Sequence, residues 1–197
     1  MIILASGSPR RKELLDQIGA DFVVQVSEAA EESGDALAPQ ELVKRNAIAK
    51  AEAVAREHPE LPVLGADTVV ALDGHTYGKP CDKADACRML RLFAGRTHEV
   101  STGIALVCGG KVHADVVTTK VTFAPLTEAE ICRYAETGEP LDKAGAYAVQ
   151  GQAAVFIEKL DGSYSNVVGL PLHALARLAG KAGVDLYGNH GERFTDN

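Results

Sequence analysis

The stretch Ile2-Ile3-Leu4-Ala5-Ser6-Gly7-Ser8-Pro9-Arg10-Arg11 predicts a short buried strand, a turn of small residues and the start of a helix. Ser8 is a favoured N-cap residue, and Pro9 suits the first helical position because its missing N–H would be unpaired there anyway. The free N–H groups and dipole of such a helix start favour an anion. Because arginine forks match phosphate oxygens, we interpret the turn as a cradle for a polyphosphate. A capped surface helix with two solvated arginines would show the same short pattern.

Composition limits the class of protein. The chain has 197 residues, 46% of them hydrophobic and 24% charged, which is typical of one globular domain or of two closely packed lobes. Its net charge of −7 argues against non-specific nucleic-acid binding, which depends on neutralising phosphates with Lys and Arg. A small anion in a local basic pocket is still compatible with that charge. The sequence has no apolar run long enough to predict a membrane span.

The cysteines and histidines show no metal-binding or disulfide pattern. No two cysteines form a C-x-x-C pair, and the six histidines are scattered. We therefore expect neither a zinc site nor a disulfide framework. Free thiols suit a reducing compartment, and the N-terminus lacks the pattern of a signal peptide, so we expect the cytoplasm. The four cysteines are Cys81, Cys87, Cys108 and Cys132.

Strand and helix patterns alternate along the chain, which predicts an α/β fold. We expect one domain over residues 1–187 and a polar, disordered tail over residues 188–197. Gly109-Gly110 predicts a hairpin between two long strands, and Thr127 with Glu130 predicts a capping box. The expected strands are 22–26, 61–72, 97–108, 111–123 and 153–159; the expected helices are 39–57, 82–94, 127–138 and 171–183; residues 161–166 are expected to form a turn.

One carboxylate interrupts an otherwise apolar strand. Asp67 follows Leu61–Ala66 and precedes further apolar residues. A buried charge costs several kcal/mol unless it is paired or binds a metal, so Asp67 needs a partner or faces a cleft. An aspartate bonded to backbone amides in a turn is the alternative. Lys50, flanked by alanines on a helix, is on its own most simply a surface residue.

Cations and carboxylates together suggest a class of reaction. Two arginines at the helix start, the lysines Lys50, Lys79 and Lys143, and several carboxylates are what hydrolysis of a nucleoside triphosphate requires. The chain lacks the G-x-x-x-x-G-K-[ST] loop, which excludes a Walker-type NTPase.

Six blocks of sequence, in order from residue 2 to about residue 180, resemble the Maf family. The blocks are Ser6–Arg11 with Glu13-Leu14-Leu15, Gly65–Thr68, Lys79-Pro80, Asp142–Tyr147, Gln150-Gly151, and Gly162-Ser163 with Asn166–Pro171. The resemblance implies a mixed, elongated sheet with flanking helices, forming two lobes around a central cleft and related to inosine triphosphate pyrophosphatases. It also implies cleavage of a nucleoside triphosphate to the monophosphate and pyrophosphate, a divalent metal cofactor (Mg²⁺ or Mn²⁺) and a homodimer.

The resemblance also implies roles for single residues. Asp67 matches the proton acceptor that activates water and, with Glu31, a metal ligand, although Glu32 is adjacent and a slip of one position stays open. Phosphate-binding positions are matched by Ser6, Arg10, Arg11, Lys50 and Lys79. Positions that select the substrate are matched by Arg11, Thr68 and Gln150.

Gln150 indicates the branch of the family. A glutamine amide donates and accepts, as the alternating O4 and N3–H of thymine and uracil require, whereas a carboxylate only accepts and suits guanine. The segment Asp142–Tyr147 with Gln150 resembles the branch that acts on dTTP and UTP, and this chemistry agrees with the resemblance. The alternatives are a 7-methyl-GTP pyrophosphatase and a non-catalytic regulator of septum formation. Ala148 departs from the glycine frequent at that position in relatives and could narrow the base pocket.

Overall fold

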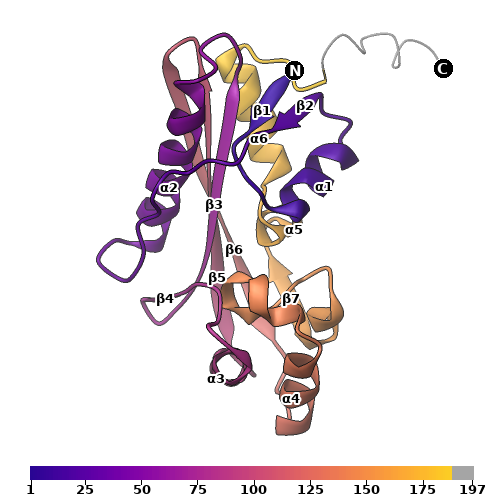
Figure 1. The fold of residues 1–197 in the computed structure, drawn as a ribbon. Helices are drawn as coiled ribbons and strands as arrows, with labels where there is room; N and C mark the ends of the chain where they lie inside the picture. Colours follow the sequence, from indigo (N-terminus) through magenta and orange to yellow (C-terminus); the bar gives the residue numbers. More distant parts are fainter. Residues whose placement is uncertain (188–197) are drawn as a thin grey trace, which may run out of the picture.

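The computed structural model describes residues 1–187 as a mixed sheet with helices on both faces (Figure 1). Its strands are β1 (Ile2–Leu4), β2 (Phe22–Val24), β3 (Val63–Leu72), β4 (His75–Tyr77), β5 (Thr97–Cys108), β6 (Lys111–Phe123) and β7 (Ile157–Asp161). Its α-helices are α1 (Pro9–Gln17), α2 (Pro39–Ala55), α3 (Lys83–Phe93), α4 (Glu128–Glu136), α5 (Tyr164–Val168) and α6 (Leu172–Ala182), and three 3₁₀ turns are η1 (Glu139–Asp142), η2 (Ala144–Ala146) and η3 (Gln152–Phe156).

The sheet is interrupted along one side of β3. The strand order is β2-β1-β3-β5-β6-β7, with β1 parallel to both of its neighbours and β5, β6 and β7 antiparallel. On one side, β5 pairs with β3 from Val63 to Ala71. On the other side, β1 pairs only as far as Leu64, and β4 begins to pair at Val70. Within residues 1–187, the edge of β3 between these two points therefore has no neighbouring strand on that side.

Alternation along β3 directs its side chains to opposite faces of the sheet. Leu64 and Ala66 join a core with α1 and α6, whereas Val63 joins a core with α2. Continuing the alternation, Asp67 belongs to the α2 face and Thr68 to the α1 face. The open stretch of edge thus carries one polar side chain for each face.

The α2 helix lies directly against the strand backbones. A Cβ on Gly65 would stand 2.2 Å from the carbonyl oxygen of Ala47, and a Cβ on Gly103 would stand 2.3 Å from that of Val43. Gly103 is the cross-strand partner of Asp67. Only glycine allows this approach, so these two residues set the distance between α2 and Asp67.

The lower half of the sheet holds a second, aromatic core. There α3 and α4 pack against the ends of β3, β5 and β6, with Phe93 and Phe123 fully enclosed. His98 lies edge-on to Tyr147, and its Nε2 is 2.8 Å from the Tyr147 hydroxyl. Burial lowers the pKa of His98 to about 3 and raises that of Tyr147. Both groups are therefore neutral members of the core.

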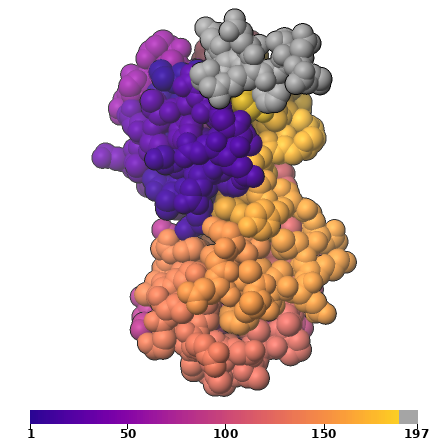
Figure 2. All heavy atoms as spheres, turned by 90° about the vertical axis from the view of Figure 1, so that its right-hand side faces the viewer, coloured from indigo at the N-terminus to yellow at the C-terminus, as the bar shows by residue number. Residues whose placement is uncertain are grey.

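Two lobes meet at a narrow waist, as expected for this α/β fold (Figure 2). The start of the chain and α6 lie in the upper lobe, and α3 and α4 lie in the lower one (Figure 1). The strands β3, β5 and β6 run through both. Among residues 1–187, no helix combines the length and apolar character needed to cross a bilayer.

Most expected elements are confirmed. The Gly109-Gly110 hairpin and the Thr127–Glu130 capping box occur as predicted. The α2 helix ends at Ala55 rather than near 57, β2 ends at Val24 rather than at 26, and α6 begins at Leu172 rather than at 171.

Two predicted elements were wrong. Residues 153–156 belong to the 3₁₀ turn η3 rather than to a strand, because the N–H of Gln152 donates to the Glu139 carboxylate and curls the chain there. Residues 164–166, expected in a turn, begin α5, because the hydroxyl of Ser163 accepts the N–H of Asn166 as an N-cap. The expected tail, residues 188–197, lies outside the described residues.

Candidate active site

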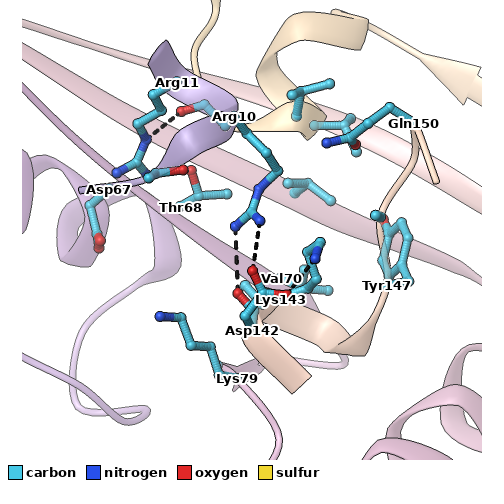
Figure 3. Close-up of a pocket in the computed structure, with 18 of the residues that line it drawn as sticks. Arg10, Arg11, Asp67, Thr68, Val70, Lys79, Asp142, Lys143, Tyr147 and Gln150 are labelled. Atoms are coloured by element: carbon cyan, nitrogen blue, oxygen red, sulfur yellow. Dashed lines mark hydrogen bonds and ion pairs between the residues drawn. The ribbon is translucent and has the colours of Figure 1, made fainter. Parts of the chain in front are cut away.

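A cavity of about 370 Å³ opens between the lobes at the unpaired edge of β3. Its walls come from α1 above, β3 behind, and η1, η2 and the following segment below (Figure 3). Of the residues expected to form a site, these line it: Arg10, Arg11, Glu31, Asp67, Thr68, Lys79 and Gln150. Ser6 and Lys50 do not line it, and each instead contacts a residue that does.

Arg11 is buried and held at three points. Its Nε donates to the carbonyl of Gly169 at 2.9 Å, its Nη1 to the Ser6 hydroxyl at 2.9 Å, and its Nη2 to the Thr68 hydroxyl at 3.2 Å. Burial lowers its pKa from the ordinary value, and the charge of Asp67 acts in the opposite direction. A guanidinium has five N–H donors, so two have no partner among residues 1–187 and can meet an anion in the cavity.

A chain of hydroxyls fixes the direction of these bonds. Thr102 donates to the backbone carbonyl of Asn166 at 3.0 Å, and its Oγ1 is 2.9 Å from that of Thr68. Because the Thr102 proton is already used, the Thr68 hydroxyl donates to Thr102 and accepts from Arg11. Thr68 therefore serves to orient Arg11 at the cavity wall.

Ser8 occupies the N-cap position of α1, but its side chain makes no capping bond, so that part of the prediction was wrong. Its own N–H donates to Ser6 Oγ at 3.3 Å. The Ser6 hydroxyl, which receives both this N–H and Arg11, holds the turn in shape instead. Pro9 begins α1 as predicted.

Asp67 and Glu31 meet at the ammonium of Lys50. Lys50 Nζ lies 2.8 Å from Asp67 Oδ1 and 2.7 Å from Glu31 Oε1. Partial burial acts to raise the pKa of Glu31, and the bond and charge of Lys50 lower it below its ordinary value. Lys50 itself is only 9% exposed, so it is a buried residue paired with carboxylates rather than a surface one.

The structure separates Glu31 from its neighbour. Glu31 lines the cavity, whereas the carboxylate of Glu32 lies 3.8 Å from Arg45 and both of these side chains are more than half exposed. Of the two acidic residues, Glu31 is therefore the one that faces Asp67.

A salt bridge crosses the lower side of the cavity. Arg10 Nη1 lies 3.1 Å from Asp142 Oδ2, and Asp142 also pairs with Lys143 (Figure 3). Partial burial acts to raise the pKa of Asp142, and these two cations lower it below its ordinary value. The upper and lower lobes are thus joined by a carboxylate that sits among the cations expected to hold phosphate.

The end of the cavity farther from Asp67 is less charged. In Figure 3, Gln150 and Tyr147 lie on one side of Arg10, and Asp67 lies on the other. The wall near Tyr147 includes Val70 and Ala148. A flat heterocycle with a polar edge matches this end, and a chain of phosphates matches the end with Arg11 and Lys79.

Sequence reasoning missed Asn46. Its side-chain Nδ2 donates to Asp67 Oδ2 at 2.9 Å, from a position only 3% exposed. The available signal was a polar residue on the apolar face of α2, one turn before Lys50.

The carboxylates suit one hard divalent cation. Within residues 1–187, no cluster of three or more His, Cys, Asp or Glu side chains is arranged as a metal site. Mg²⁺, however, binds through one or two carboxylates and completes its shell with water and substrate phosphates. Glu31 and Asp67, which already converge on one ammonium, fit this pattern.

Comparison with known proteins gives the family. A family model described as "Maf-like protein" matches residues 1–182. The chain belongs to the Maf family. A relative from Symbiobacterium thermophilum is 50% identical over 94% of this chain and 96% of its own length, and one from Bacillus pumilus is 48% identical over 93% and 97%. Both, like a 51% identical relative from Bacillus cytotoxicus that covers 89% of this chain and 92% of its own length, are named dTTP/UTP pyrophosphatase.

Membership of the Maf family agrees with the fold and with where the six blocks of sequence lie. The blocks containing Arg11, Asp67, Lys79, Asp142 and Gln150 come from separate elements and meet at one cavity. The sequence match therefore corresponds to a single site in the structure.

Proposed function

We propose that this protein hydrolyses dTTP and UTP to the nucleoside monophosphate and pyrophosphate. The observation that carries the proposal is the cavity at the open edge of β3, where guanidinium groups and a paired carboxylate lie beside an uncharged pocket that ends at Gln150. The names of relatives that are about half identical over nearly the whole chain support the same substrates.

The cations hold the triphosphate. Arg11 offers its two remaining N–H donors, and Lys79 projects from the loop after β4 on the opposite wall. Arg10 reaches the phosphates by exchanging the Asp142 carboxylate for a substrate oxygen. Fixed charges of this kind stabilise the negative charge that develops on phosphoryl oxygens during transfer.

Asp67 acts on water at the α-phosphate. The water oxygen forms a bond to the α-phosphorus as the bond to the α–β bridging oxygen breaks, and pyrophosphate leaves with that oxygen. Asp67 accepts the proton of the attacking water. Lys50 and Asn46, which bind its two oxygens, hold the carboxylate in a fixed orientation toward the cavity.

We propose that Glu31 and Asp67 hold Mg²⁺ or Mn²⁺ together with the substrate phosphates. Such a cation, when bound, neutralises phosphate charge and polarises the scissile bond. Lys50, which bridges the two carboxylates in the absence of the cation, keeps them together.

Gln150 recognises the base of the nucleotide by hydrogen bonding. Its amide presents a donor and an acceptor to the O4 and N3–H of thymine or uracil, and a site built to pair these atoms rejects a base that leaves them unpaired. A 7-methyl-GTP pyrophosphatase is disfavoured for this reason, and a purely regulatory protein would not need a partly buried Asp67–Lys50 pair. We further propose a homodimer that works in the cytoplasm without binding nucleic acid or membranes.

The test is a substrate panel. The purified protein is incubated with Mg²⁺ or Mn²⁺ and dTTP, UTP, CTP, GTP or 7-methyl-GTP, and monophosphate and pyrophosphate are measured. We expect turnover of dTTP and UTP, and a loss of about 100-fold or more in kcat for Asp67→Asn, because general-base catalysis contributes that much. Thermal melting checks that the variant is folded.

Other results would change the proposal in defined ways. Release of orthophosphate would contradict cleavage between the α- and β-phosphates. Turnover of 7-methyl-GTP alone would overturn the role of Gln150. No turnover of any nucleotide by folded protein would favour the regulator.

A further inference from the structure

Asn46 is a buried amide in the middle of α2. Its Nδ2 donates to Asp67 Oδ2 at 2.9 Å and to the backbone carbonyl of Glu32 at 3.0 Å, and its Oδ1 accepts the N–H of Glu32 at 2.8 Å. Burying an amide is unfavourable unless its polar atoms are bonded, and here both donor positions and the acceptor are used.

The partners determine which way the amide faces. If its nitrogen and oxygen were exchanged, the oxygen would face the carboxylate of Asp67 and the carbonyl of Glu32, both acceptors. A side chain here must donate twice and accept once. Leucine makes none of these bonds, and an aspartate keeps only the acceptor.

Asn46 and Lys50 repeat one arrangement a helical turn apart. Positions i and i+4 lie on the same face of a helix. Lys50 joins the Glu31 side chain to Asp67 Oδ1, and Asn46 joins the Glu32 backbone to Asp67 Oδ2. Both oxygens of Asp67 and two successive residues of the loop before α2 are therefore tied to this helix.

Asn46 does not line the cavity, so it acts through the groups it holds. We propose that Asn46 is a positioning residue that orients the Asp67 carboxylate and fixes the Glu31–Glu32 segment beside it. This inference rests on the proposed function, because it assigns Asn46 a part in the same reaction. The backbone bond to Glu32 also directs the Glu32 side chain toward Arg45 and leaves Glu31 facing the cavity.

The experiment compares Asn46→Leu and Asn46→Asp with Arg45→Ala. Arg45 neighbours Asn46 on α2, and its ion pairs within residues 1–187 are with the exposed carboxylates of Glu32 and Glu41, so its variant is the matched control. Two measurements are made: steady-state kinetics, which give kcat and KM for dTTP, and hydrogen exchange of the Glu32 amide without nucleotide. Thermal melting is recorded for each protein.

We expect kcat of both Asn46 variants to fall by about tenfold or more with little change in KM, because misplacing a catalytic group costs rate while the phosphate-binding cations remain. The Glu32 amide should exchange fast in Asn46→Leu and remain protected in Asn46→Asp, which keeps the acceptor. Arg45→Ala should match the wild type in both measurements.

Wild-type kcat in both Asn46 variants would overturn the inference. So would wild-type protection of the Glu32 amide in a folded Asn46→Leu protein. If Asn46→Leu fails to fold, Asn46→Asp decides on its own, since its kcat must fall while its Glu32 amide stays protected. A wild-type protein that turns over no nucleotide would refute the proposed function, and the inference with it.

Discussion

Glu31 and Glu32 are chemically identical neighbours in opposite surroundings, which makes them a matched pair for testing the proposed metal site. Glu31 faces Lys50 and the cavity, and Glu32 faces Arg45 and solvent. We expect Glu31→Gln to lower kcat/KM for dTTP by about tenfold or more and to raise the Mn²⁺ concentration needed for half-maximal rate. The reason is that one of the two carboxylates proposed to bind the metal is lost. The kcat/KM of Glu32→Gln should stay within about twofold of the wild type, because the exposed ion pair that is lost, Glu32–Arg45, contributes little to stability.

The measurements are kcat/KM from a dTTP titration and a Mn²⁺ titration of the initial rate at saturating dTTP, done in parallel on both variants. Equal effects of the two substitutions would contradict the assignment of Glu31. A larger effect of Glu32→Gln would assign the proposed metal ligand to Glu32 instead of Glu31.

At the scale of residues, motif reasoning found the charged groups but not their neighbours. Arg11, Asp67 and Lys79 lie in short blocks whose composition already indicates phosphate chemistry. Asn46 carries no such signal, because its partner Asp67 lies 21 residues away along the chain and is brought to it only by helix–sheet packing. Asp142 was expected as part of a block, but its salt bridge to Arg10 spans 132 residues and could not be predicted.

At the scale of elements, the close packing of α2 against the backbones of Gly65 and Gly103 can be tested. A methyl group at Gly103 would meet the Val43 carbonyl oxygen at 2.3 Å and the Lys44 nitrogen at 2.8 Å, both rigid backbone atoms. We expect Gly103→Ala to destabilise the protein by about 1–3 kcal/mol, as overpacking does, and to lower kcat because α2 is pushed away from Asp67. Urea unfolding and dTTP kinetics measure the two effects.

Gly180 in α6 is the control, since a methyl group there meets nothing within 4 Å. Gly180→Ala should be stabilising by about 0.5–1 kcal/mol, because alanine has the higher helix propensity. Unchanged stability and kcat in Gly103→Ala would show that α2 tolerates displacement.

Local signals predicted most elements because their causes are local. Glycine pairs, Asp82 and the Thr127–Glu130 box act within four residues of where they stand. The failure at residues 164–166 is local too, since the Ser163 N-cap begins α5 there, whereas the failure at residues 153–156 has a more distant cause. Residues 153–156 form η3 because of a carboxylate at Glu139.

At the scale of the whole molecule, three strands pass from one lobe to the other. The β5–β6 ladder is continuous from Thr97 to Cys108, and β3 pairs with β5 over most of its length. We propose that residues 1–187 are one domain and expect one calorimetric transition, with equal calorimetric and van't Hoff enthalpies. Two transitions would mean that the lobes unfold separately.

The gap along β3 was beyond sequence reasoning. Predicting it requires knowing that β1 stops pairing with β3 at Leu64 and that β4 starts at Val70, which no local pattern encodes. The sequence supports an α/β fold with a cleft, and the pairing of distant strands decides where the cleft lies.

The bond between Arg11 and Gly169 has a consequence for synthesis on the ribosome. Arg11 is made well before the carbonyl that holds its Nε, which lies 158 residues later. Thr68 and the Thr102–Asn166 contact that orient it arrive in between. A nascent chain therefore carries its arginines and carboxylates without a formed nucleotide site until Gly169, the residue that ends α5, has been made.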